Sequence, residues 1–269
     1  PINSSNDIED YKLTVLGYAL SEGNMCHPHG FYVFSSDPKQ IEEYCQSLEN
    51  FKNTKATVSD KSRHLCPSVY SGRINLKEPS EAVEWMRSIG MYGKKATEKI
   101  FPSFVFNLNP QKIAFLIAKM WEGDGCINIG KNGYVNTYYA TSSRKMALQM
   151  QHLLLRLGIV SSIHIKKFNY RGGFKTGYTI NISGRYSGLN FCNTIGQYLS
   201  TKKQIMEETK TIYSNYGTNG NGLLARGSKD LISYDILPEI QSAVLEKHKN
   251  LKNFAKEIGI SERSFYTCA

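Results

Sequence analysis

The stretch FLIAKMWEGDGCI, residues 115–127, is an apolar segment that ends in two acids alternating with glycines. The apolar part is typical of a helix packed in a core, and the acids are Glu122 and Asp124. A helix ends in unpaired carbonyl groups and a partial negative charge, so carboxylates placed there are unfavourable unless a cation joins them. The stretch therefore predicts a core helix whose C-terminal end binds a cation.

The same form occurs near the N-terminus, where residues 13–25 read LTVLGYALSEGNM. Glu22 and Gly23 stand there in the places of Asp124 and Gly125. A strand candidate, paired serines leading into a helix, two segments with period-two alternation and a further helix follow each stretch. These segments are residues 31–51, 56–61, 68–76 and 80–91 in the first copy, and 138–159, 161–168, 177–184 and 186–199 in the second. The repeat predicts an α+β protein of two tandem αββαββα-like halves, residues 1–107 and 108–215.

The composition narrows the class of protein. Among 269 residues, 33 are lysine or arginine and 23 are aspartate or glutamate, a formal net charge of +10. An excess of this size favours polyanionic partners, of which nucleic acid is the commonest inside a cell. The sequence has no run of about 18 apolar residues, and its polar N-terminus lacks the blocks of a signal peptide. We therefore expect an intracellular protein, in the cytoplasm and nucleoid or in an organelle, without a membrane partner.

The six cysteines are scattered without any CxxC pair. This spacing favours reduced thiols over a disulfide framework. The cluster CHPH, Cys26 to His29, has the form of half a zinc site, but no second Cys/His pair completes the four ligands that a structural zinc needs. We therefore expect no zinc site there.

A lysine follows each helix-end acid at a matched distance. Lys99 lies 99 − 22 = 77 residues after Glu22, and Lys202 lies 202 − 124 = 78 residues after Asp124. Other lysines lie close to these positions: Lys94, Lys95 and Lys203. Each copy thus carries an acid at the end of its first helix and a lysine just beyond its last helix.

The two helix-end stretches resemble the signature helices of the LAGLIDADG homing endonucleases. VLGYALSEG, residues 15–23, and IAKMWEGDG, residues 117–125, stand where the nine-residue motif occurs, and KIFPSFVF, residues 99–106, is similar to the segment before the second helix in intein-type members. The resemblance covers about residues 11–210. It implies a monomer in which the motif helices pack at a pseudo-twofold axis, within a saddle of antiparallel sheets. Each helix would deliver one carboxylate to the scissile phosphates of double-stranded DNA, and nearby lysines would stabilise charge in the transition state. The candidate catalytic residues that the resemblance implies are Glu22, Asp124, Lys99 and Lys202.

The resemblance also implies the metal ligands. In this family the acid before the last glycine binds the metal, which gives Glu22 and Asp124 this role and leaves Glu122 as a support residue. Mg²⁺ prefers oxygen ligands and keeps several waters, so it fits two carboxylates plus phosphate oxygens. Mn²⁺ is an alternative, and Ca²⁺ is a non-catalytic substitute. The backbone near Gly23 or Gly125 is a further candidate ligand.

Two residues depart from the family pattern. Lys119 stands where a small residue normally lets the two helices approach, although Ala118 and Gly17 leave room for contact. Glu22 stands where aspartate is commoner. Its side chain is one methylene longer, which keeps metal binding feasible.

Recognition of DNA is expected from the strands, since a two-stranded ribbon fits the major groove, about 12 Å wide. In residues 71–77 the expected polar face consists of Ser71, Arg73, Asn75 and Lys77, with Ile74 and Leu76 toward the core. In the second half the expected contacts are Tyr134, Asn136, Tyr138, His164, Lys166, Thr179, Asn181 and Ser183, together with Arg171 and Lys175 in the loop 169–177. For any one of these residues a plain solvent-facing role stays open.

The C-terminal part, residues 216–269, differs in composition. Residues 214–230, SNYGTNGNGLLARGSKD, are typical of a linker. The following segment is helical in pattern, and residues 250–266 resemble a helix-turn-helix that presents Arg263 and Ser264 to a DNA groove. A helical hairpin that only packs is the alternative.

Three functions are compatible with these patterns. The first is a site-specific, Mg²⁺-dependent double-strand DNA endonuclease that acts in intron or intein homing. The second is a non-catalytic DNA-binding regulator, against which the presence of both Glu22 and Asp124 argues. The third is an RNA maturase on the same basic sheets. With Pro1 at its start and Cys268-Ala269 at its end, the given polypeptide is not expected to splice.

Overall fold

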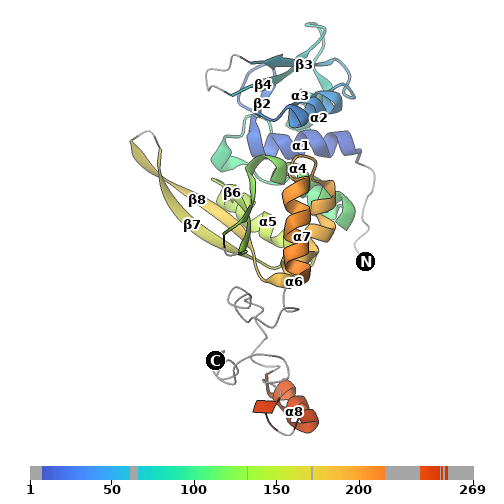
Figure 1. The fold of residues 1–269 in the computed structure, drawn as a ribbon. Helices are drawn as coiled ribbons and strands as arrows, with labels where there is room; N and C mark the ends of the chain where they lie inside the picture. The colour runs from blue at the N-terminus through green and yellow to red at the C-terminus, as the bar shows by residue number, and fades with distance from the viewer. Residues whose placement is uncertain are drawn as a thin grey trace.

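The computed structural model has two consecutive halves that repeat one order of elements (Figure 1). It describes residues 8–60, 66–131, 133–170, 172–215, 237–248, 250 and 252–253. The first half consists of α1 (Asp10–Glu22), β1 (Gly23–Asn24), β2 (Phe31–Phe34), α2 (Pro38–Leu48), β3 (Thr54–Ser59), β4 (Ser68–Arg73) and α3 (Glu81–Ser88). The second half consists of α4 (Pro110–Asp124), β5 (Gly125–Ile129), β6 (Val135–Thr141), α5 (Arg144–Arg156), β7 (Ser161–Tyr170), β8 (Gly173–Ile182) and α6 (Arg185–Thr194). The αββαββα order expected from the repeat is confirmed.

Each half contributes one four-stranded antiparallel sheet, with the strand orders β1-β2-β4-β3 and β5-β6-β8-β7. Short 3-10 turns connect the halves and the last helices: η1 (Ala96–Glu98), η2 (Ser103–Asn107) and η3 (Gly196–Tyr198). The helix α7 (Lys203–Asn215), which the sequence patterns did not predict, packs against α6. The matching strand orders show that the second half repeats the topology of the first.

A helix in the C-terminal part, α8 (Leu237–His248), confirms the helical pattern expected there. The helix-turn-helix-like segment lies mostly outside the described residues, as do Arg263 and Ser264. The same holds for residues 216–236 of the expected linker and for Arg171. The expectations for these residues stay predictions.

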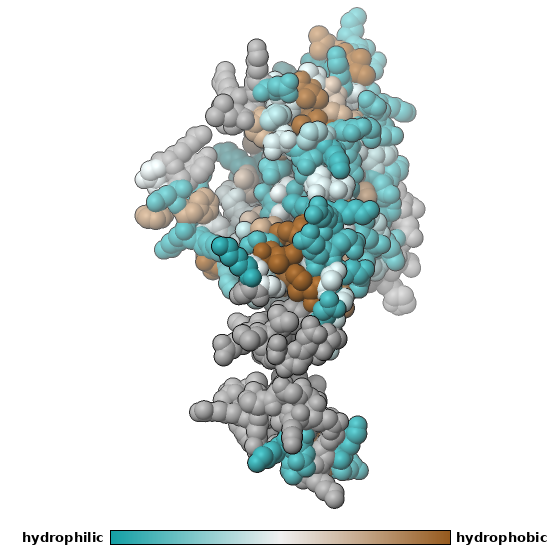
Figure 2. Space-filling view, in the orientation of Figure 1, coloured by the Kyte–Doolittle hydropathy of each residue, from teal (hydrophilic) through white to brown (hydrophobic). Residues whose placement is uncertain are grey.

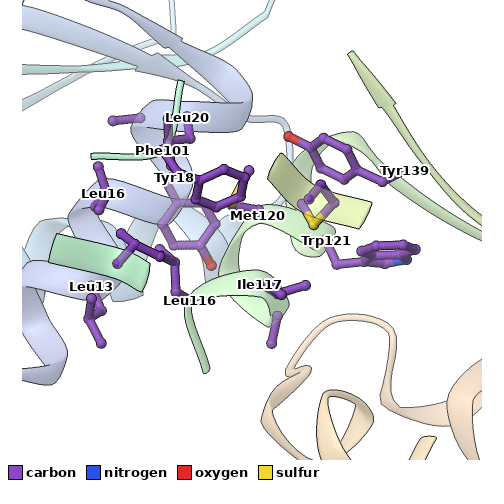
Figure 3. Close-up of a cluster of buried hydrophobic side chains, with 14 of the residues drawn as sticks. Leu13, Leu16, Tyr18, Leu20, Phe101, Leu116, Ile117, Met120, Trp121 and Tyr139 are labelled. Atoms are coloured by element: carbon purple, nitrogen blue, oxygen red, sulfur yellow. The ribbon is translucent and has the colours of Figure 1, made fainter. Parts of the chain in front are cut away.

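The central helices α1 and α4 lie side by side, and their apolar side chains interlock between the two halves (Figure 3). Eight consecutive residues of α1, 13–20, and nine of α4 are buried. A helix that is apolar on all sides must be covered on all sides. The two sheets and the outer helices supply this cover, which fixes α1 and α4 in the centre of the molecule.

The outer helices begin at capping residues that the sequence supplies. Asp37 accepts hydrogen bonds from the backbone N–H groups of Lys39 and Gln40 at the start of α2. Ser143, from the second pair of serines, accepts one from the N–H of Met146 at the start of α5. These bonds satisfy N–H groups that have no partner within a helix. The second pair of serines therefore supplies the cap of α5, whereas the cap of α2 is the aspartate that follows the first pair.

The first sheet corrects the expected polar face of residues 71–77. Strand β4 ends at Arg73, and Ile74 and Leu76 are 66% and 73% exposed in the turn that follows. Ser71 is fully buried and its hydroxyl lies 2.8 Å from the hydroxyl of Tyr44. Because side chains alternate between faces, a frame that is wrong by one residue exchanges the two faces of a strand. Ser71 therefore belongs to the core face.

The other two members of that expected face, Asn75 and Lys77, also lie in the turn after β4. Asn75 accepts a hydrogen bond from the N–H of Lys77 and donates its own N–H to Asn53, which fixes the turn. The ladder pairs Arg73 with Thr54 at the end of the strand. None of these residues continues a polar strand face, so the expectation of a face from Ser71 to Lys77 is wrong.

The second sheet has the face expected from its alternation. The ladders pair Tyr138 with Asn181, Asn181 with Ser162, and Thr179 with His164, which puts these side chains on one face. The ammonium group of Lys166 lies 5.6 Å from the ring centre of Tyr138, as expected for neighbours on that face. Opposite them, Tyr139 and Ile180 are buried in the core. The polar face of β6, β7 and β8 is therefore confirmed.

Most described residues on the visible face of the molecule are hydrophilic (Figure 2). In the part of the chain that the structure describes, no helix has the length and apolar character needed to span a membrane. The long hairpin of β7 and β8 projects from the body of the second half (Figure 1). Its exposed lysines include Lys166, Lys167 and Lys175.

Candidate active site

Glu22 and Asp124 are the last residues of α1 and α4, and the chain turns at once from each helix into a strand. Gly23 and Gly125 make this turn possible. A β-carbon on Gly23 would lie 2.3 Å from the carbonyl oxygen of Ala19, and one on Gly125 would lie 2.2 Å from Trp121 Cδ1. No side chain fits at such distances, which explains why each acid is followed by glycine.

The two helix tips touch each other. A β-carbon on Gly123 would lie 2.5 Å from Ser21 Oγ and 3.0 Å from Glu22 Cγ. Further along the same seam, a β-carbon on Gly17 would lie 2.5 Å from Lys119 Cβ. The structure therefore brings Glu22 and Asp124 to one place from positions 102 residues apart (124 − 22).

The two candidate lysines bind the carbonyl groups at the helix ends. Lys99 Nζ donates to the carbonyl oxygens of Leu20 and Ser21 at 3.0 and 3.1 Å. Lys202 Nζ donates to carbonyl oxygens of α4 and of the residue after it, those of Trp121, Glu122 and Gly125 at 2.5, 3.0 and 2.6 Å. Each lysine binds carbonyls of the last helical turn, where most have no partner within the helix, and offsets the negative helix end. The sequence indicated the lysines but not these partners.

Burial and neighbouring charges shift the pKa values of this group. Burial and the charge of Asp124 raise the pKa of Glu22 to about 7, against the effect of Lys99 and Lys202. Burial also raises the pKa of Asp124, and it lowers the pKa of Lys202 and that of Lys99, the latter to about 8. Burial raises the pKa of Tyr139, and the nearby charge of Asp124 raises it further. The hydroxyl of Tyr139 makes no hydrogen bond of normal geometry with the described residues. Two carboxylates thus share a space that disfavours their charge.

The raised pKa of Glu22 predicts a pH-dependent stability. Between pH 4.5 and about 7 the folded protein holds a proton that the unfolded chain releases, so stability falls as pH rises through this window. We expect Glu22→Gln to reduce this fall to the part that Asp124 contributes, and to gain about 2 kcal/mol over the wild type at pH 8. Chemical denaturation at pH 5 and pH 8, without divalent ions, measures it.

The matched control for this measurement is Glu84→Gln, which removes an exposed carboxylate on α3. It should leave the pH dependence of the wild type unchanged. An equal slope in the wild type and the Glu22→Gln variant would contradict the raised pKa.

Glu122, the expected support residue, is 3% exposed and holds the segment that precedes Lys202. Its carboxylate accepts hydrogen bonds from the backbone N–H groups of Ser200 and Thr201, the latter at 3.1 Å, and from both hydroxyl groups. From the first half, Gln40 Nε2 donates to the Glu122 carbonyl oxygen at 3.1 Å. Glu122 therefore positions Lys202 under the tip of α4.

Glu122→Ala should leave the N–H groups of residues 200 and 201 without their acceptor. Unsatisfied buried groups of this kind cost about 2 kcal/mol of stability. Denaturant unfolding measures the loss, and Glu42→Ala, which removes an exposed carboxylate on α2, is the control. A loss no larger than that of the control would contradict the support role.

A cavity connects Asp124 with the polar face of the second sheet. Lys166, Phe168 and Thr179 line it together with Asp124, and its volume is about 320 Å³. Thr179 is 6% exposed, so the surface that it retains faces this cavity. The carboxylate thus lies next to the surface expected to contact DNA.

The structure also places the remaining candidates of the second half. Asn136 pairs with Asn128 in the ladder, Tyr134 precedes β6 and is 51% exposed, and Lys175 lies near the end of the hairpin. Ser183 follows β8 and its N–H donates to the Val160 carbonyl. Cys126 and Asn128 of β5 lie on the same face as Tyr138 and Asn136, and they were not among the candidates expected from the sequence. Their alternation with Ile127 and Ile129 in the sequence is the pattern that indicates this face.

The donor set at the helix tips fits a divalent ion. It consists of two carboxylates from different helices, the hard oxygen ligands that Mg²⁺ prefers. Within the described ranges, no group of three or more His, Cys, Asp or Glu side chains is placed to hold a metal ion. A metal at the tips would complete its coordination with water and phosphate oxygens, as Mg²⁺ usually does.

Residues 111–196 match the model of a family described as the LAGLIDADG-like domain. This match contains Asp124, β5 to β8 and the cavity. The chain carries a LAGLIDADG-like domain. The LAGLIDADG-like domain is the second of the two halves, and the first half repeats its topology.

Among curated proteins, the chain is similar to small parts of longer ones. It is 26% identical over 239 residues to the replicative DNA helicase DnaB of Synechocystis sp., which covers 87% of this chain and 27% of that protein. Over 201 residues it is 28% identical to DnaB of Rhodothermus marinus, covering 73% and 21%. Over 127 residues it is 29% identical to RecA of Mycobacterium tuberculosis, covering 42% and 16%. The chain thus spans about a quarter, or less, of the length of these relatives.

Among solved structures, the chain resembles homing endonucleases. The structure of mesophilic variants of the homing endonuclease I-DmoI matches with a TM-score of 0.50 at 12% identity, over 74% of this chain and 97% of that one. The homing endonuclease I-WcaI bound to its DNA recognition sequence matches with a TM-score of 0.49 at 14% identity, over 75% and 86%. At this identity the likeness to I-DmoI concerns the fold, which is the two-half LAGLIDADG fold.

Proposed function

We propose that the chain is a site-specific double-strand DNA endonuclease that hydrolyses phosphodiester bonds with a divalent metal ion. The observation that carries the proposal is the meeting of Glu22 and Asp124 at two helix tips. Burying two carboxylates side by side is costly, and nothing in the packing of the core requires it. A fold that bears such a cost at one place, beside a cavity, is typical of a functional site.

In this proposal Glu22 and Asp124 each supply one carboxylate to the metal. Lys99 and Lys202 hold the two helix ends through their carbonyl groups, so the carboxylates stay in register, and their positive charge lies near the phosphate that is cut. Mg²⁺ or Mn²⁺ bound there would acidify the attacking water and neutralise charge on the leaving oxygen, whereas Ca²⁺ would bind without supporting cleavage. The cavity beside Asp124 gives the phosphate access to the site.

The partner in this proposal is double-stranded DNA, and one chain suffices because it provides both carboxylates. The polar face of β6, β7 and β8 would lie in the major groove. Its lysine next to the cavity, Lys166, would contact phosphate, and Asn136 and Asn181 would reach base edges. The net charge of +10 supports binding to a polyanion inside a cell.

The pattern of relatives supports a mobile element of the intein or intron type. The replicative DNA helicase DnaB and the protein RecA share similarity with this chain over no more than 27% of their length. A segment that occurs in proteins with such different names is not the segment that carries out the function in either name. We therefore propose nuclease activity for this chain, and not the activities of the longer proteins that contain similar segments.

The test is to incubate the protein and Mg²⁺ with a library of DNA duplexes that contain a randomised region, and to sequence the cut ends. We expect cutting of both strands at one long sequence, with Ca²⁺ giving binding but no cuts. Selection of a bound sequence without cuts in Mg²⁺ or Mn²⁺ would overturn the nuclease and favour the non-catalytic regulator. Absence of any selected duplex would overturn both.

A further inference from the structure

The outward face of the first sheet carries a cluster of aromatic rings. In β2 and β4 the side chains of Phe31 and Val33 and of Val69 and Ser71 are buried against the helices. The ladder pairs Tyr32 with Tyr70, so both point to the opposite face. Their ring centres lie 4.8 Å apart. The loop between β1 and β2 adds His27 to this pair.

The ring of Tyr70 lies close over the backbone of two glycines, Gly30 and Gly72. A β-carbon on Gly72 would lie 2.6 Å from Tyr70 Cε1, and a β-carbon on Gly30 would lie 2.6 Å from Tyr70 Cε2. The ring therefore occupies the space where two side chains would otherwise stand. A ring that lies over glycine backbone presents its other face outward.

His27 completes this surface, and hydrogen bonds fix its position. Its ring centre lies 5.5 Å from that of Tyr32 and 5.2 Å from that of Tyr70, edge to face in both cases. Tyr92 donates its hydroxyl to the carbonyl oxygens of His27 and Gly30, the latter at 3.2 Å. We name the three rings of His27, Tyr32 and Tyr70 the aromatic platform. The CHPH cluster, Cys26 to His29, thus packs against aromatic side chains, because the ring of His27 contacts the rings of Tyr32 and Tyr70.

The aromatic platform is continuous with the candidate active site. Tyr32 pairs with Asn24, which follows Glu22 by two residues. On the other side, Lys55 and Thr57 of β3 pair with Gly72 and Tyr70 and share their face. A duplex that reaches Glu22 along this face would therefore cover the platform. At the corresponding place, the second sheet carries the single ring of Tyr138, which pairs with Asn181 and has the ammonium group of Lys166 over it at 5.6 Å.

We propose that the first half reads its part of the DNA site by apolar contact between the aromatic platform and the 5-methyl groups of thymines in the major groove. The thymine methyl is the one apolar group that base edges present in this groove, and aromatic side chains contact it favourably. Asparagines and hydroxyl groups of the second half would instead form hydrogen bonds to bases. This inference rests on the proposed binding of double-stranded DNA.

The test replaces thymine by uracil, which lacks only the methyl group, in each half of the duplex selected from the library. With the wild type in Ca²⁺, we expect uracil in one half-site to weaken binding about three- to fourfold per contacted methyl, and uracil in the other half-site to have little effect. With Tyr70→Ala, binding should be weaker and the uracil effect in that half-site should vanish. Equilibrium binding to labelled duplexes measures each constant.

Two further variants separate contact from folding. Tyr70→Phe keeps the ring and should keep the uracil effect, whereas Asn136→Ala in the second half should weaken binding and leave that effect unchanged. If Tyr70→Ala does not fold by circular dichroism, Tyr32→Ser replaces it, with the same expected loss of the effect, because serine provides no apolar surface for the methyl group. A uracil effect that is absent from both half-sites, or that persists in the platform variants, overturns the inference. Failure to select any duplex would instead overturn the proposed function.

Discussion

Asp124→Asn should reduce the rate of DNA cleavage about a thousandfold, equivalent to about 4 kcal/mol of transition-state stabilisation. Asparagine has the shape of aspartate but lacks the charge that holds a divalent ion beside the phosphate. Affinity for the selected duplex in the absence of divalent ions should stay within about twofold or rise, because a negative charge near the DNA backbone is removed. Single-turnover cleavage in Mg²⁺ and equilibrium binding measure the two effects.

The same substitution should leave the fold intact or stabilise it. Asp124 is buried at a helix end, where its pKa is raised, so the charged form is unfavourable in the absence of metal. Asp124→Asn should therefore raise the melting temperature slightly and abolish the further rise that Mg²⁺ gives the wild type. Asp60→Asn, which removes an exposed carboxylate directly after β3, is the control and should change neither quantity. An unfolded Asp124→Asn variant would make the residue structural.

The sequence predicted the centre of this site because its signal is local. An apolar run followed by acid and glycine occurs twice, and each acid lies at the end of the helix where the pattern puts it. The resemblance to the LAGLIDADG family is confirmed by the LAGLIDADG-like domain at residues 111–196 and by the fold. The expected contact at Gly17 is also observed.

Contacts between distant residues had no such signal. Nothing in the sequence indicates that Lys202 reaches three carbonyl oxygens of the second helix end, or that Gln40 of the first half bonds to Glu122. The first contact depends on how the second half folds back on itself, and the second on how the two halves pack. The prediction of which face of β4 is polar was wrong for a related reason, because Ser71 is polar and yet buried against Tyr44. A polar residue satisfied in the core cannot be distinguished from a surface residue by alternation alone.

Lys119 shows how the fold accommodates a departure from the family pattern. Its side chain leaves the seam between the helices, and its Nζ lies 2.5 Å from Glu43 Oε1 on α2. Tyr18 donates its hydroxyl to the other oxygen of Glu43 at 2.6 Å. Only the β-carbon of Lys119 stays in the seam, opposite Gly17. The lysine is tolerated because its partner residue is glycine and because its charge finds a carboxylate.

Gly17→Val should therefore lower the free energy of unfolding by at least about 3 kcal/mol and abolish cleavage. Even one β-carbon at residue 17 would lie 2.5 Å from Lys119 Cβ and 3.3 Å from the backbone oxygen of Leu116, so the helices must separate. Separation moves the tip of α1 away from that of α4, and the carboxylates no longer share a metal. Gly17→Ala should show a smaller loss of both quantities, and Lys145→Val, in the exposed first turn of α5, should change stability by less than about 1 kcal/mol. Denaturant unfolding and cleavage of the selected duplex, measured side by side, give the result.

Wild-type stability in Gly17→Val would mean that the helices do not pack closely at this seam. A stable variant with full cleavage would show that catalysis does not depend on the contact of the two helices.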